Sequence, residues 1–184
     1  MHTSSFRCSN NSIDWTWCAK HNTVVNDIYI YTYIHTWLLE KPSYPVKIQV
    51  RNGKNVIFDS LRRKYVALTP EEWVRQHFIH LLTDFKGYPK GLLANEVQLD
   101  LNGTRKRCDT VLFNKDLSAR MIVEYKAPSV EITQAVFDQI TRYNMVLKVE
   151  YLIVSNGIHH YCCRIDYSTM KYTFLPDIPA YKEL

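Results

Sequence analysis

Two apolar segments in the second half of the chain, Cys108–Phe113 and Met121–Ala127, are interrupted by charged residues. The first segment contains Asp109, and the second contains Glu124 and Lys126. Burying an ionisable group costs several kcal/mol unless the group pairs with an opposite charge or binds a metal. The chain must therefore fold so that these three side chains meet a partner, and we expect them to form the functional site.

The order of the predicted elements indicates one mixed α/β domain with a central sheet and helices packed on it. At 184 residues, with 46% hydrophobic and 22% charged residues, the chain has the size and composition of a single globular domain, which we place at residues 43–184. The predicted order is a hairpin, a helix, three strands, a second helix and two strands. The expected strands are 46–50, 55–58, 96–101, 106–114, 120–126, 150–154 and 160–167, and the second helix is 131–147.

Turn and capping signals define the beginning of this domain. Asn52 and Gly53 lie between two alternating segments, and this dipeptide is typical of a tight hairpin turn. Thr69 is the predicted N-cap of the first helix, with Pro70 at the first helical position and Glu72 completing a capping box. The hairpin and the start of this helix follow directly from local sequence.

Residues 1–42 differ from the rest of the chain because they are rich in Asn, Thr, Tyr, His and Trp. We expect a poorly ordered segment or an upstream extension from a misassigned start codon; the alternative is an accessory strand or helix packed on the domain. The most apolar run, Val24–Leu39, is too short and too polar to span a membrane. A secretory signal is not expected, and the five cysteines, which include no C-x-x-C pair, favour a reducing cytoplasm over a zinc site.

The formal net charge of +5 is concentrated in parts of the chain. Residues 47–64 contain six Lys and Arg residues and a single acid, Asp59. Arg105, Lys106 and Arg107 come just before Asp109 and are candidate nucleic-acid-binding residues. A basic border beside carboxylates suits a phosphodiester substrate, although charge alone is equally consistent with an ordinary basic surface.

The two carboxylates and the lysine have the chemistry of a magnesium site. Alternation places Glu124 and Lys126 on one face of a strand, and Asp109 on a face with Val111 and Phe113. If the two strands pair, Asp109 and Glu124 can converge on one cation, because Mg²⁺ prefers carboxylate and water oxygens. Lys126 could then hold a water or stabilise charge on a phosphate. A salt-bridge network without function is the alternative.

Two polar residues of the second predicted helix extend this constellation. Gln139 and Tyr143 are four residues apart, so they share one face of the helix. The amide of Gln139 could anchor the lysine or a phosphate oxygen. A structural role in the core is the alternative for both residues.

In this order, Asp109, Glu124-x-Lys126 and Gln139-x-x-x-Tyr143 resemble the motifs of the PD-(D/E)XK nuclease superfamily, and in particular the N-terminal nuclease-like domain of type I restriction enzyme R subunits. The resemblance covers roughly residues 44–184. The segments that carry it are Leu68–Phe78 (LTPEEWVRQHF), Glu124–Pro128 (EYKAP), Phe137–Asn144 (FDQITRYN) and Tyr151–Gly157 (YLIVSNG).

The resemblance implies a metal-dependent phosphodiesterase fold with a four-stranded mixed sheet flanked by helices. Asp109 and Glu124 would be the metal-binding acids, and Lys126 the catalytic lysine. Glu72 matches the approximate place of an additional metal-orienting acid, with the capping box as its alternative role. Cys108 stands where the superfamily motif has a proline, which removes no ligand.

The expected function is a cytoplasmic, bacterial-type endo- or exonuclease that uses Mg²⁺, with Mn²⁺ as a substitute, to hydrolyse phosphodiester bonds of nucleic acid, with DNA favoured over RNA. The resemblance implies products with a 5′-phosphate and a 3′-hydroxyl. The chain has no room for a helicase motor, so we expect a free-standing relative whose partners are DNA and either a second copy or a helicase or restriction subunit, and no membrane. The alternative is a catalytically silent module that keeps the nuclease fold to bind nucleic acid or to assemble with a partner.

Overall fold

The structure is a computed structural model, and it describes residues 46–101 and 104–184. Within these ranges, twelve side chains are not described: those of Leu99, Asp100, Leu101, Thr104, Lys106, Gln134, Asp138, Gln139, Arg142, Tyr143, Met145 and Val146. The expectations for residues 1–42 lie outside the described residues.

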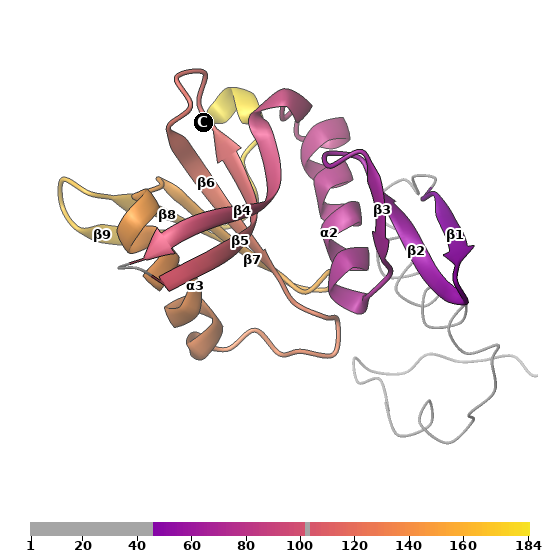
Figure 1. Cartoon of the computed structure of the whole chain (residues 1–184). Coiled ribbons are helices and arrows are strands. Elements are labelled where there is room, and N and C mark those ends of the chain that lie inside the picture. Colours follow the sequence, from indigo (N-terminus) through magenta and orange to yellow (C-terminus); the bar gives the residue numbers. More distant parts are fainter. Residues whose placement is uncertain (1–45, 102–103) are drawn as a thin grey trace, which may run out of the picture.

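A six-stranded mixed sheet forms the centre of the domain (Figure 1). Its strands follow chain order across the sheet, and the pair β6–β7 is parallel while the other four pairs are antiparallel. The helix α3 (Gln134–Leu147) makes the crossover that a parallel pair requires. The strands are β4 (Leu93–Leu101), β5 (Thr104–Phe113), β6 (Ala119–Tyr125), β7 (Tyr151–Ser155), β8 (His160–Asp166) and β9 (Lys171–Leu175).

Helices cover both faces of this sheet, as the sequence predicts. On one face, α2 (Pro70–His80) packs Val74 and Phe78 against a cluster that includes Met121 and Val123 of β6. On the other face, Ile140 of α3 lies in a second cluster with residues of β5, β6 and β7. The result is a three-layer α/β/α arrangement in which β6 is buried from both sides.

The predicted N-terminal hairpin is part of a three-stranded antiparallel sheet. Asn52 and Gly53 form the turn with φ values of 51° and 71°, the positive values that a tight hairpin turn needs. This confirms the hairpin, but the third strand of the sheet was not predicted. The strands are β1 (Ile48–Arg51), β2 (Lys54–Asp59) and β3 (Lys64–Ala67). In Figure 1, α2 lies between this small sheet and the six-stranded sheet.

The first helix begins as predicted, with one difference. Thr69 is the N-cap, and its hydroxyl accepts a hydrogen bond from Glu72 N at 3.0 Å, with Pro70 at the first helical position. The Glu72 carboxylate does not bind the backbone of Thr69, as a capping box requires, because it forms ion pairs with two arginines instead. The helix passes into a π-helical turn at Leu81–Phe85, and the chain then turns at Gly87, whose φ is 73°.

The central sheet differs from the expected four strands by having six. The edge strand β9 is largely exposed, so its sequence lacks the apolar pattern that marks a buried strand. Two short 3₁₀ turns, Lys90–Leu92 and Tyr181–Glu183, complete the described elements. Within the described residues, no helix has the length and apolar character needed to cross a membrane.

Candidate functional site

Arg75 is the centre of a buried group of ion pairs beside the predicted site. Its guanidinium contacts Glu72 at 2.6 Å, Glu96 at 2.8 Å and Asp109 at 2.7 Å, and its side chain is 7% exposed. Burial lowers the pKa of Arg75, but the carboxylates of Asp109, Glu72 and Glu96 raise it further, so the net direction is upward and the group stays charged. We call this group, with Arg62, the Arg75 cluster: Arg62, Glu72, Arg75, Glu96 and Asp109.

Arg62 connects the small sheet to this cluster. It follows β2, ion-pairs with the buried carboxylate of Asp59, and also donates to both oxygens of Glu72 at 3.1 Å. Asp59 in turn accepts from Asn95 of β4 at 2.8 Å. Because these hydrogen bonds lower the pKa of Asp59 against the opposing effect of burial, its carboxylate is held charged. The small sheet, α2 and β4 therefore meet at one polar junction.

The backbone of β4 is strained where it approaches Asp109. The register pairs Asn95 with Thr110 and Val97 with Cys108, which puts Glu96 opposite Asp109. Glu96 has a φ of 60°, a conformation that costs a non-glycine residue roughly 1–2 kcal/mol. Strain of this kind concentrates at functional sites, where surrounding contacts hold it in place. Here the ion pair of Glu96 with Arg75 supplies such a contact.

Asp109 does not lie on the face that simple alternation predicts. Val111 and Phe113 pack in the cluster on the α3 side, whereas the carboxylate of Asp109 contacts Arg75 of α2 on the opposite side. Cys108 also packs on the α3 side with Val111, although the two are three residues apart, so alternation is interrupted between them. The distortion at Glu96 is the physical reason, because it breaks the regular pairing at this point of the ladder.

The second oxygen of Asp109 binds the backbone of β6. Tyr125 N donates to Asp109 Oδ2 at 2.8 Å, while Arg75 binds Oδ1. Strands β5 and β6 pair in antiparallel register, as the predicted hairpin requires. Asp109 therefore lies next to the end of β6, where the other two predicted site residues are found.

Glu124 and Lys126 form an ion pair at the end of β6. Lys126 Nζ lies 3.1 Å from Glu124 Oε1, and the side chain of Glu124 is 8% exposed. Among the described residues, the buried atom Glu124 Oε2 has no hydrogen-bond partner. Burial and the nearby charge of Asp109 raise the pKa of Glu124 to about 7, against the opposite effects of Lys126 and Arg75. A buried carboxylate with one unpaired oxygen is suited to bind a proton or a cation.

The oxygen atoms of Glu124 and Asp109 are of the kind that a hard cation prefers. Glu124 Oε2 offers an unpaired ligand atom, and each oxygen of Asp109 keeps a second lone pair beside its present hydrogen bond. Within the described part of the chain, no three His, Cys, Asp or Glu side chains are arranged to hold a metal together. An ion here would take two carboxylates and fill its shell with water or substrate oxygens, as Mg²⁺ commonly does. Glu72 is fully engaged by Arg62, Arg75 and Gln76.

The structure describes the side chains of only some of the remaining predicted site residues. Gln139 and Tyr143 both lie in α3, but their side chains are outside the description. Arg105 and Arg107 are exposed on β5, and Arg107 pairs with Glu96 at 2.5 Å, at the edge of the Arg75 cluster. The side chain of Lys106 is also not described.

Cys108, which precedes Asp109, has the character of a small core residue. It is fully buried, and burial together with the charges of Glu124 and Asp109 raises its pKa to about 12. A thiol with this pKa stays neutral near pH 7 and is a poor nucleophile and a poor metal ligand. Cys162 and Cys163 are likewise buried.

Sequence reasoning missed three members of the cluster: Arg62, Arg75 and Glu96. A local signal existed for Arg75, because it lies three residues after Glu72 and so on the same helical face. Arg62 was noted for its charge alone. Glu96 begins a predicted strand, and nothing in its neighbourhood indicates that it faces an arginine from another element.

Comparison with known proteins gives two findings. The sequence model of a family described as type I restriction enzyme R protein N terminus matches residues 70–179. A solved fragment described as a putative HsdR subunit of a type I restriction enzyme from Vibrio vulnificus YJ016 is similar over 64% of this chain, with 21% sequence identity and a TM-score of 0.47. The similarity covers 24% of that solved chain, so this chain spans about a quarter of its length. No curated protein matches the chain.

Proposed function

Because the chain belongs to the family of type I restriction enzyme R protein N termini, we propose that it is a nuclease domain of the PD-(D/E)XK type that hydrolyses phosphodiester bonds of DNA. The observation that carries the proposal is the unpaired, buried oxygen of Glu124 beside Asp109 and Lys126. A protein gains nothing in stability from such an atom. Its presence is explained if the carboxylate binds a ligand during function.

Asp109 and Glu124 would hold a Mg²⁺ ion, with Mn²⁺ as a substitute. When bound, such an ion lowers the pKa of a water and neutralises charge on a phosphate oxygen. Lys126 would position the attacking water through Nζ, whose contact with Glu124 Oε1 already fixes its direction. In-line attack by this water would leave a 5′-phosphate and a 3′-hydroxyl.

Arg75 would act on this site as a positioning residue. It holds Asp109 through Oδ1 while Tyr125 N holds Oδ2, so the carboxylate cannot rotate freely. A fixed carboxylate needs no reorganisation when charge develops, which is the main source of catalysis by polar sites. Glu72 would orient Arg75, and Gln139 and Tyr143 would assist from α3.

The first test is cleavage of plasmid, linear duplex and single-stranded DNA in the presence of Mg²⁺, Mn²⁺ or EDTA. We expect metal-dependent cleavage, and a fall of about 100- to 1,000-fold in rate for Lys126→Ala, because a charge-stabilising donor is removed. Lys115→Ala is the matched control, since Lys115 is exposed in the loop between β5 and β6. Full activity of Lys126→Ala, with its far-UV spectrum unchanged, would contradict the assigned site.

A second candidate function is a silent module that binds nucleic acid or assembles with a restriction partner. The observation in its favour is that both oxygens of Asp109 are already bound by Arg75 and Tyr125 N, as in a closed structural network. This candidate predicts DNA binding that persists in EDTA, together with no cleavage in either metal. A double-strand cutter would also need two sites, and therefore a second copy or a partner subunit.

A further inference from the structure

The three-stranded sheet carries the positive charge of the protein. Residues 46–67 contain six Lys and Arg residues against one acid, so this segment has a net charge of +5, equal to the formal net charge of the whole chain. The acid, Asp59, is fully buried and paired with Arg62. In the rest of the chain the positive and negative charges balance, so the net charge of the protein equals that of this segment.

The sheet also has a distinct outer face. The register places Arg51 beside Lys54 and Phe58 beside Tyr65, on the side opposite the buried Ile57. Lys47 Nζ lies 5.6 Å from the centre of the Phe58 ring. The guanidinium of Arg51 lies 4.2 Å from the centre of the Tyr65 ring. Cations held over aromatic rings in this way keep a preferred position while they remain exposed to a ligand.

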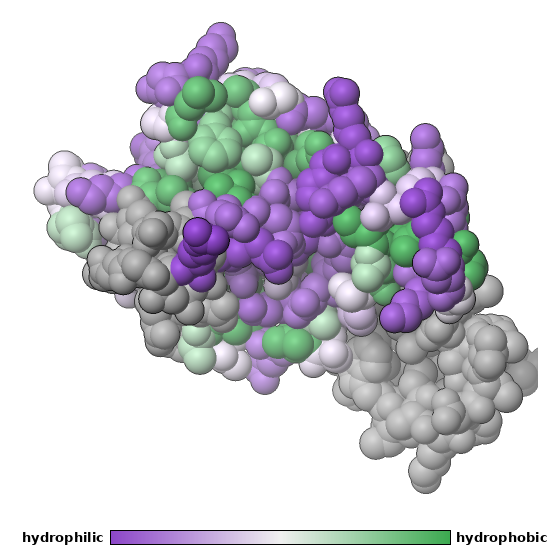
Figure 2. Space-filling model, viewed as in Figure 1, coloured by the Kyte–Doolittle hydropathy of each residue, from purple (hydrophilic) through white to green (hydrophobic). Residues whose placement is uncertain are grey.

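The outer face presents no carboxylate among the described residues of β1, β2 and β3. Its members, taken from the register, are Lys47, Gln49, Arg51, Lys54, Val56, Phe58, Tyr65 and Ala67. Hydrophilic side chains lie over this sheet at the right of Figure 2. We call this surface the basic face.

The basic face is linked to the proposed catalytic site. Arg63 and Lys64 are exposed at the β2–β3 turn, and the same turn carries Arg62, which contacts Glu72 of the Arg75 cluster. A strand of six residues such as β2 spans about 20 Å. Arg51 pairs with Lys54 at one end of β2, and Lys47 lies beside Phe58 towards the other end, so these cations can reach separate phosphates of one nucleic-acid strand. The family match begins at residue 70, so the basic face lies outside the matched part.

We propose that the basic face binds the phosphate backbone of duplex DNA, on the side of the small sheet that is opposite the buried Ile57. The occupant is a polyanion because the face combines several exposed cations with no exposed acid, and Lys and Arg gain affinity for such a backbone by releasing its counterions. The assignment to DNA rests on the proposed nuclease function. Backbone contacts carry no sequence information, so the face would fix register and orientation without selecting a sequence.

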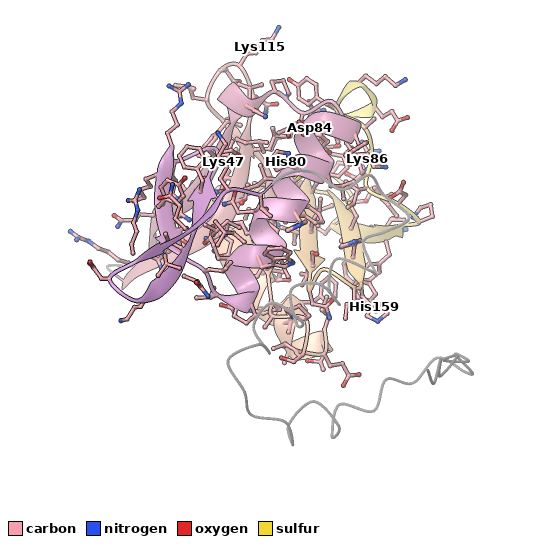
Figure 3. The ribbon with its side chains drawn as sticks, turned by 90° about the vertical axis from the view of Figure 1, so that its right-hand side faces the viewer. Lys47, His80, Asp84, Lys86, Lys115 and His159 are labelled. Carbon is pink, nitrogen blue, oxygen red and sulfur yellow. The ribbon has the colours of Figure 1, made fainter. Side chains whose placement is uncertain are left out.

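The test is equilibrium binding of the full chain to a fluorescein-labelled 20-base-pair DNA duplex in EDTA, measured by anisotropy over a range of salt concentrations. The variant is Lys47→Gln with Arg51→Gln and Lys54→Gln. The control is Lys115→Gln with Lys171→Gln and Lys182→Gln, which removes the same charge from exposed positions elsewhere. Figure 3 labels Lys47 and Lys115, which project from different elements.

We expect the basic-face variant to bind the duplex at least about tenfold more weakly at 100 mM salt. The slope of the logarithm of the binding constant against the logarithm of the salt concentration should also decrease in magnitude by about two to three, because each phosphate contact contributes about 0.9 to this slope. We expect the control to change affinity by less than about threefold. Equal weakening by both variants would overturn the proposal, because the effect would then reflect net charge. The proposal would also be overturned if the basic-face variant lost more binding to duplex RNA, or to phosphatidylglycerol vesicles, than to DNA.

Binding in EDTA does not depend on cleavage, so this test and the test of nuclease function can fail separately. Loss of cleavage in Lys126→Ala with normal DNA binding would support the catalytic site alone. Loss of DNA binding in the basic-face variant would support the basic face even if no metal produced cleavage. Normal DNA binding of that variant would overturn the basic face and leave the nuclease proposal intact.

Discussion

Asp109 and Glu124 lie on adjacent strands, but the regions around them differ in how completely the buried carboxylates are paired. In the Arg75 cluster, each carboxylate contacts at least one arginine, and Asp109 has both oxygens bound. At the end of β6, Glu124 shares one lysine contact and keeps a buried oxygen without a partner among the described residues. The first region holds elements together through its ion pairs, whereas the second keeps an unpaired oxygen, the atom on which the proposed function depends.

The largest expected effect comes from removing the centre of the cluster. Arg75→Met leaves Glu72, Glu96 and Asp109 without their shared cation, and breaking a buried ion pair in this way costs about 3–5 kcal/mol of unfolding free energy. Urea denaturation at pH 7 measures this loss. The control is Arg164→Met, because Arg164 is 57% exposed and solvent screens its pair with Glu150. Similar losses in both variants would remove the distinction between buried and surface pairs.

An intermediate effect, of opposite sign, is expected at Glu124. Its pKa in the folded protein is raised to about 7, above the ordinary value of 4.5 for a glutamate. The folded state therefore binds the proton more tightly, and this contribution to stability is present below pH 4.5 and is lost as the pH rises towards 7. Glu124→Gln keeps the shape without the charge. We expect it to be more stable than the unmodified protein by about 1–3 kcal/mol at pH 8.

At pH 4 the unfolding free energy of Glu124→Gln should not exceed that of the unmodified protein, because Glu124 is then largely neutral in both the folded and the unfolded state. Thermal or urea unfolding across pH 4–8 measures the difference. If Glu124→Gln were less stable than the unmodified protein at pH 8, the carboxylate would belong to the structural network like Asp109.

The smallest effect is expected for Lys126→Met. Lys126 lowers the pKa of Glu124, so its removal should raise that pKa further and shift the pH at which stability is lost towards higher values. At pH 6 we expect a change in unfolding free energy below about 1 kcal/mol, because Glu124 can take up a proton instead of remaining an unpaired charge. A loss as large as that of Arg75→Met would show that the lysine has a structural role equal to that of the arginine.

Local signals account for most of the correct predictions. The Asn52-Gly53 turn and the Thr69 cap depend on residues that are adjacent or three apart, so the sequence itself contains the interaction. The inner strands β6 and β7 were found because burial from both sides leaves continuous apolar runs. The edge strands β3 and β9 were missed because partial exposure removes this pattern.

The candidate site was predicted in part for the same reason. Glu124 and Lys126 are two residues apart on one strand, and alternation correctly places them together. Asp109 was identified because a charge in an apolar segment is conspicuous, but its orientation depends on a distortion at Glu96 in the neighbouring strand. Sequence patterns assume a regular ladder, so they cannot show where a ladder is broken.

By itself, the sequence determined the α/β class, the order of the main elements and the presence of three costly charges within apolar strands. The tertiary structure decided which charge has which partner: Arg75 reaches Asp109 across 34 residues, and Arg62 reaches Glu72 of α2 from the turn between β2 and β3. It also placed the three-stranded sheet beside α2, with the basic face on the side opposite the buried Ile57. These pairings depend on strand order and packing between distant segments, and the energy of a buried charge is set by its neighbours in space rather than along the chain.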